Sequence, residues 1–114
     1  MIFEQTTLKG AVIINLKRIA DERGFFSRTF CAREFQAADL ASVFVQSNMS
    51  FSRQKGTLRG MHYQIAPFQE AKLVRCTAGA IYDVAVDLRR DSSSFRRWFG
   101  IELSAANATM LYVP

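Results

Sequence analysis

The chain has 114 residues, of which 49% are hydrophobic and 22% charged, so it is long enough for one domain with a modest core and too apolar for a disordered chain. No apolar run approaches the roughly 20 residues that a membrane-spanning helix needs, so we do not expect a membrane protein. The net charge of +5 comes from scattered arginines with no recognition helix, zinc-finger spacing or RNP-like signature, and this argues against nucleic-acid binding.

Short apolar or alternating runs recur along the chain with turn residues between them, which predicts an all-β sandwich or barrel. One segment, residues 32–40, is typical of a helix, with Phe35 and Leu40 as its apolar anchors. No repeat or linker divides residues 1–114, so we expect a single domain. In chain order, the predicted strands are 11–15, 24–30, 43–50, 57–64, 71–77, 80–87, 97–103 and 109–113.

The first residues of the chain and its two cysteines indicate the cellular compartment. The first residues have neither the basic region nor the apolar region of a secretory signal. Cys31 and Cys76 lie far apart and form no CxxC unit, which favours reduced thiols. We therefore expect a cytoplasmic protein.

His62 is the only histidine and the first candidate for chemistry. Alternation in the predicted strand 57–64 places it on one face with Leu58, Gly60 and Gln64. A lone histidine is more often structural than catalytic, yet no other side chain here has an unperturbed pKa that suits a base near neutral pH. A metal-binding barrel would supply several histidines, so we expect no metal.

Lys72 and Asp83 lie in two further apolar strands. A lysine directed into such a strand needs a partner, although one at a strand end can also reach solvent. Asp83 shares a strand face with Asp87 and could orient His62 or pair with Lys72. A salt bridge without any catalytic role is the alternative for Asp83.

Several segments of the chain together form a pattern in order and spacing. They are DERGFF from Asp21, FVQSN from Phe44, GTLRGMHYQ from Gly56, KLVR from Lys72, DVAVDLR from Asp83 and LSA from Leu103 with LYVP ending at Pro114. In this pattern the chain resembles the dTDP-4-dehydrorhamnose 3,5-epimerases throughout, of which it would represent about the N-terminal two-thirds. The resemblance implies a cupin jelly-roll fold (a double-stranded β-helix) in a homodimer that exchanges N-terminal strands. It also implies epimerisation of carbons beside the C4 ketone of a nucleotide-linked 4-keto-6-deoxy sugar, without a cofactor.

The same resemblance assigns roles to individual residues. His62 would be the general base, and Lys72 would stabilise the enolate at the C4 oxygen. Asp83 is a third catalytic candidate because of its position in the strand. The nucleotide diphosphate and sugar would be bound by Arg23, Gln46, Asn48 and Arg59, with Arg23 reaching the partner subunit's site. Phe26 and Arg28 are further candidate substrate-binding residues.

The chain also departs from the family pattern. Arg28 stands where much of the family has a glutamate against the thymine ring, which implies either a different contact to the base or a different nucleotide, such as a CDP-sugar. The family's tyrosine acid and base-orienting aspartate would follow Pro114. Two alternatives therefore stay open: a non-catalytic sugar-nucleotide-binding or degenerate cupin, and a keto-sugar isomerase on the same fold.

Overall fold

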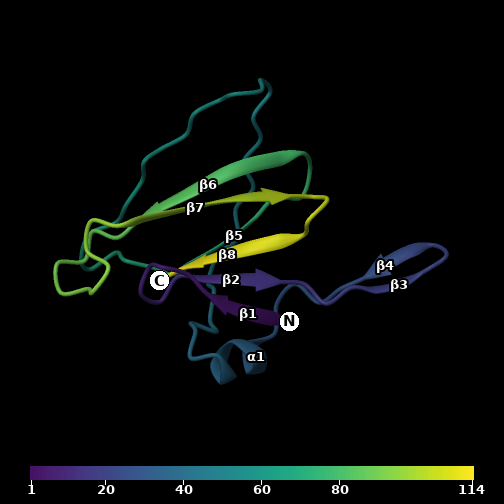
Figure 1. Cartoon of the computed structure of the whole chain (residues 1–114), viewed down its shortest axis with the longest axis horizontal. Helices are drawn as coiled ribbons and strands as arrows, with labels where there is room; N and C mark the ends of the chain where they lie inside the picture. Colours follow the sequence, from purple (N-terminus) through teal and green to yellow (C-terminus); the bar gives the residue numbers. More distant parts are fainter.

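The computed structural model describes residues 1–114 and has eight strands and one short helix, which confirms the all-β prediction. Figure 1 shows two layers, a four-stranded sheet and the β6–β7 hairpin, with a second hairpin protruding to one side. No helix is long and apolar enough to cross a membrane. The elements are β1 Ile2–Gln5, β2 Val12–Asn15, β3 Ile19–Asp21, β4 Gly24–Phe26, α1 Ala32–Ala37, β5 Lys72–Arg75, β6 Ala80–Val86, β7 Trp98–Ser104 and β8 Thr109–Val113.

The core lies between the four-stranded sheet and α1. The sheet has the order β1-β2-β8-β5, and each neighbouring pair is antiparallel. Alternate residues of β2 and β8 are buried on the face toward α1, because successive side chains of a strand point to opposite faces. Phe35 of α1 is fully buried among them and makes edge-on contacts with neighbouring rings, including that of Tyr112.

A second buried region lies on the opposite face of the sheet. Leu111 of β8 and Leu103 of β7 are both fully buried but are not part of the cluster around Phe35. Alternation places Leu111 on the face of β8 away from Phe35, and this face looks toward the β6–β7 hairpin (Figure 1). The sheet is therefore the middle layer, with α1 on one side and β6–β7 on the other.

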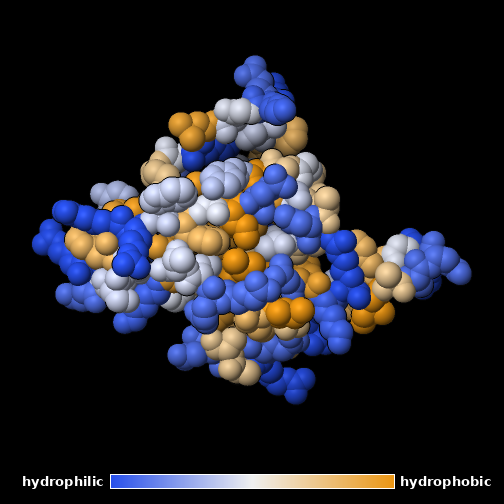
Figure 2. Space-filling model, viewed as in Figure 1, coloured by the Kyte–Doolittle hydropathy of each residue, from blue (hydrophilic) through white to orange (hydrophobic).

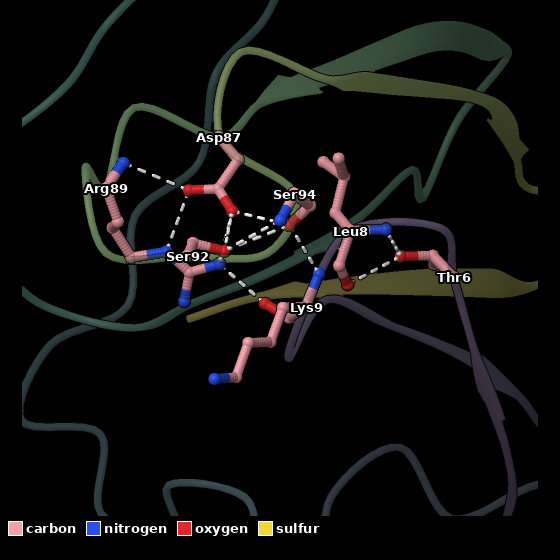
Figure 3. A network of polar contacts seen from close by, with 7 residues as sticks. All are labelled: Thr6, Leu8, Lys9, Asp87, Arg89, Ser92 and Ser94. Atoms are coloured by element: carbon pink, nitrogen blue, oxygen red, sulfur yellow. Dashed lines mark hydrogen bonds and ion pairs between the residues drawn. The ribbon is translucent and has the colours of Figure 1, made fainter.

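A polar network ties the two β layers together at one end (Figure 3). The Asp87 carboxylate, in the loop after β6, accepts hydrogen bonds from the Ser92 and Ser94 hydroxyls and from the Arg89 guanidinium. Ser94 and Arg89 in turn bond the backbone of Lys9, in the β1–β2 turn. Asp87 thereby fixes the β6–β7 hairpin relative to the sheet.

The predicted strands 43–50 and 57–64 are wrong, because residues 41–71 contain no strand. These residues make a single backbone–backbone hydrogen bond among themselves, from the Phe68 amide to the Ile65 carbonyl. A strand requires a neighbour that pairs with its backbone groups, and no other part of the chain lies beside this segment as a ladder partner. The alternating pattern was real, but its apolar side chains, such as Val45 and Leu58, are about nine-tenths exposed.

The other predicted elements agree with the observed ones to different extents. The predicted strand 24–30 is shortened to β4, and the helix predicted over 32–40 ends at Ala37. The predictions for β2, β5, β6, β7 and β8 are confirmed within one or two residues. Two short strands, β1 and β3, were not predicted, because each has too few apolar residues for a pattern to be recognised.

The chain is unusually open for its size. It exposes 9029 Å² of surface, whereas a folded monomer of 12.9 kDa is expected to expose about 6,300 Å². Figure 2 shows apolar atoms at the surface across the middle of the molecule and along the base of the β3–β4 hairpin. Residues 41–71, drawn in teal in Figure 1, account for many of the exposed apolar side chains.

Candidate active site

Lys72 and Asp83 lie on the sides of their strands that face the opposite β layer. Lys72 pairs with Val113 of β8, and the next residue, Leu73, packs against the core around Phe35. Alternation therefore turns Lys72 to the opposite face, toward β6–β7. Asp83 lies on the same face of β6 as Ile81, whose partner across the hairpin is the buried Leu103. The fold thus places one cation and one carboxylate on the facing sides of the two β layers.

The environment of Asp83 differs from that of an exposed carboxylate. Burial raises the pKa of Asp83, and a hydrogen bond from the Val84 backbone amide partly offsets this effect. The Asp83 side chain forms no ion pair or hydrogen bond with Lys72 or His62, so the predicted pairing is wrong for this structure.

Glu70 is the partner of Lys72 instead. The Lys72 Nζ lies 2.8 Å from Glu70 Oε1. Hydrogen bonds from Lys72, and then from Gln64 and Gln46, lower the pKa of Glu70. Glu70 is a residue that the sequence reasoning missed. Its spacing of two residues before Lys72 is the signal that could have found it, because residues i and i+2 of an extended segment lie on one face.

His62 lies in the strand-free segment and is exposed. Its imidazole makes no hydrogen bond to another side chain, and its nearest glycine is Gly60, where an added Cβ would lie 3.5 Å from His62 Nδ1. Gly60 has a φ of +115°, so this position requires glycine for its backbone conformation. The face that was predicted for His62 with Leu58 and Gln64 is not formed, because residues 57–64 are not a strand.

The arginines with predicted binding roles all have partners within the chain. Arg23 pairs with Asp21 at 2.6 Å in the β3–β4 turn, which raises the pKa of Arg23. Arg28 pairs with Glu34 of α1 at 2.7 Å. Arg59 donates to the Phe51 carbonyl and to Ser52. These side chains are exposed, so each is free to exchange its partner for a ligand.

The remaining predicted residues are spread over the open side of the molecule. Gln46 and Asn48 are exposed in the strand-free segment, and Phe26 is 72% exposed on the β3–β4 hairpin. Two hollows of about 390 and 210 Å³ occur elsewhere on the surface, and neither is lined by a predicted site residue. No group of three His, Cys, Asp or Glu side chains is arranged to hold a metal ion.

An all-β fold of the cupin type, with ionisable side chains directed between its layers, defines the class of this chain. Residues 5–114 match the family model described as dTDP-4-dehydrorhamnose 3,5-epimerase. The chain is 45% identical over 111 residues to the dTDP-4-dehydrorhamnose 3,5-epimerase of Shigella flexneri, with 96% of this chain and 61% of the relative covered. It is 41% identical to the enzyme of the same name from Sinorhizobium fredii, covering 100% of this chain and 58% of the relative.

Solved structures agree with these relatives. The dTDP-4-dehydrorhamnose 3,5-epimerase of Elizabethkingia anophelis superposes with a TM-score of 0.95 at 43% identity, covering 100% of this chain and 62% of that one. The dTDP-6-deoxy-D-glucose-3,5-epimerase of Legionella pneumophila, solved in complex with dTDP-4-keto-L-rhamnose, has a TM-score of 0.90 at 40% identity, covering 99% of this chain and 60% of that one. The chain belongs to the dTDP-4-dehydrorhamnose 3,5-epimerase family, and it spans about three-fifths of the length of these relatives.

Proposed function

We propose that this chain acts on a nucleotide-linked 4-keto-6-deoxy sugar and epimerises carbons beside its C4 ketone. The observation that carries the proposal is the placement of Lys72 and Asp83 on the facing sides of the two β layers, in a chain of this family. The complex of the Legionella relative with dTDP-4-keto-L-rhamnose supports the same class of substrate.

The proposed chemistry begins with removal of a proton beside the ketone. His62 takes that proton, the C–H bond breaks, and its electrons move to the C4 oxygen as an enolate forms. The Lys72 ammonium stabilises the negative charge that develops on this oxygen. A proton from water is then delivered to the opposite face of the carbon, where the enolate electrons re-form the C–H bond and the centre is inverted. His62 returns its proton to water, so the reaction needs no net oxidation or reduction. Arg23 and Arg59 bind the nucleotide diphosphate and Arg28 contacts the base. Phe26, Gln46 and Asn48 help to orient the sugar.

Matched substitutions test the division of roles between Lys72 and Arg59. With the 4-keto sugar nucleotide as substrate, Lys72→Ala lowers kcat strongly and weakens binding less, because its charge matters most once the enolate has formed. Arg59→Ala shows the opposite bias, since a diphosphate contact is made equally in the ground state. Equal effects of both substitutions on kcat and KM contradict the assignment. Nucleotide-sugar binding without any turnover supports a non-catalytic binding protein instead.

We also propose that two copies of the chain form a homodimer in which the β3–β4 hairpin contacts the partner. The hairpin protrudes from the body (Figure 1), and Ile19, Phe25 and Phe26 on it are 66%, 53% and 72% exposed. Such a surface is unfavourable in water, and an excess exposed area of about 2,700 Å² is ample for a stable interface. In this arrangement, Arg23 reaches the partner's site.

Light scattering tests the homodimer. We expect a dimer for the wild type and dissociation for Phe26→Asp, whereas Glu22→Gln at the hairpin tip is the control and leaves the dimer intact. A monomer at micromolar concentration contradicts the proposal.

We place the protein in the cytoplasm, and the free thiols of Cys31 and Cys76 support this. We treat residues 1–114 as one cupin-type domain.

A further inference from the structure

The Lys72 side chain is flexible, whereas the proposed reaction requires its ammonium to be held in one position. An ammonium on a flexible four-carbon stem populates many rotamers, and a cation that stabilises an enolate must be held in one place. β5 is an edge strand of the sheet, so its only strand neighbour is β8, on one side. The backbone alone therefore does not fix where the ammonium lies.

Glu70 supplies the missing restraint. Its carboxylate lies 2.8 Å from the Lys72 Nζ, and the two side chains are only 36% and 47% exposed. Glu70 precedes β5 by two residues, so the extended chain carries both side chains to the same side. Gln64 and Gln46 of the strand-free segment also lower the pKa of the Glu70 carboxylate, after the larger effect of Lys72.

We propose that Glu70 is a positioning residue for Lys72: its carboxylate holds the ammonium on the side facing β6–β7, where the ketone oxygen is to bind. This proposal rests on the proposed epimerase function. An ammonium has three N–H donors, of which the bond to Glu70 uses one and leaves two for the substrate oxygen. Glu70 therefore orients the ammonium and leaves two of its N–H donors available to the substrate oxygen.

The first test detects the ion pair without any need for activity. Proton–nitrogen correlation NMR observes a lysine ammonium when an ion pair slows the exchange of its protons with water. We expect a Lys72 ammonium signal in the wild type, assigned by its loss in Lys72→Arg, and its disappearance in Glu70→Gln. The control is Glu102→Gln, which makes the same charge change on β7 at a side chain without an ion pair and leaves the signal in place. A Lys72 signal that persists in Glu70→Gln, or that is missing from the wild type, overturns the proposal.

The second test asks whether this restraint serves the reaction. With the 4-keto sugar nucleotide, we expect Glu70→Gln to lower kcat about ten- to hundredfold and to leave KM within about twofold, because orientation is lost while diphosphate contacts remain. Unchanged kcat after loss of the ammonium signal overturns the positioning role. If the wild-type chain has no activity with any 4-keto sugar nucleotide, the proposed function fails, and with it the catalytic purpose of the restraint. The NMR result then still decides whether Glu70 holds Lys72.

Discussion

Replacement of Asp87 by asparagine is the sharpest test of how the two β layers are held together. The Asp87 side chain is 1% exposed and lies beside Arg89, which is 48% exposed. One carboxylate oxygen accepts from the Arg89 Nε at 2.9 Å, and the other accepts from the hydroxyls of Ser92 at 2.5 Å and Ser94 at 2.6 Å. Asparagine removes the charge and turns an amide donor toward groups that are themselves donors.

The expected loss of stability follows from these contacts. A hydrogen bond to a charged group contributes about 1.5–3 kcal/mol, and breaking a buried ion pair costs about 3–5 kcal/mol. Water can solvate the freed Arg89 guanidinium, because that side chain is half exposed. We therefore expect Asp87→Asn to lower the free energy of unfolding by about 2–4 kcal/mol, a large part of the total for a domain of this size.

The stabilisation by Asp87 also depends on pH in a defined direction. The Arg89 guanidinium, with the hydroxyls of Ser92 and Ser94, holds the pKa of Asp87 well below its usual range. In the unfolded chain this carboxylate binds a proton near its ordinary pKa of about 3.9. The contribution is therefore complete at neutral pH and is lost as the pH falls below about 4 toward the lowered value of the folded state.

Urea unfolding followed by circular dichroism measures both effects. The difference in unfolding free energy between the wild type and Asp87→Asn should be large at pH 7 and smaller at pH 3. Asp91→Asn, an exposed carboxylate in the same loop, is the control and should change stability by less than about 0.5 kcal/mol. An Asp87→Asn loss no larger than that of the control, or a difference that grows in acid, refutes the reasoning.

Three further outcomes are expected. Phe35→Ala should destabilise by about 3–5 kcal/mol in urea unfolding, because the ring is fully buried and its removal leaves a cavity; a loss below about 1 kcal/mol contradicts the described core. Tyr112→Phe should cost about 1 kcal/mol in the same assay, since the Ala41 amide donates to its hydroxyl at 3.1 Å; unchanged stability argues against this bond. Calorimetric titration with dTDP, UDP and CDP should show no strong preference for thymine, because the Arg28 cation cannot accept the thymine N–H; a dTDP preference that is lost in Arg28→Ala and kept in Arg28→Glu contradicts this account.

Every predicted strand that the structure confirms has a partner strand within the chain. β6 and β8 are rich in Val, Ile and Tyr, and both find neighbours, so local pattern and tertiary pairing agree. Residues 43–50 and 57–64 carry an equally good pattern but no ladder forms beside them. A single-sequence pattern reports that a segment is suited to a sheet, not that another strand is available to pair with it.

The sequence predicted which residues belong to the candidate site better than it predicted the contacts between their side chains. The two-residue alternation of a strand correctly placed Lys72 on one face with Val74. The same alternation gives the faces on which Lys72 and Asp83 lie in their strands. The pairing of Lys72 with Glu70 was missed, because a charged residue in a predicted loop looks like a solvated side chain. The role of Asp87 was also missed, since its partners Ser92 and Ser94 are brought back to it only by the loop that follows β6.

Solvent deuterium exchange into the sugar tests the central claim most directly. The chain is incubated in deuterated water with a nucleotide-linked 4-keto-6-deoxy sugar, and proton NMR follows the loss of signal at the carbons beside the ketone. We expect exchange at one or both carbons in the wild type and a loss of about 10²–10⁴-fold in His62→Ala, as removal of a general base typically causes. Binding of the sugar nucleotide by calorimetry is the control and should survive in the variant. Normal binding with exchange that is unchanged in His62→Ala would contradict the assignment of His62 as the base.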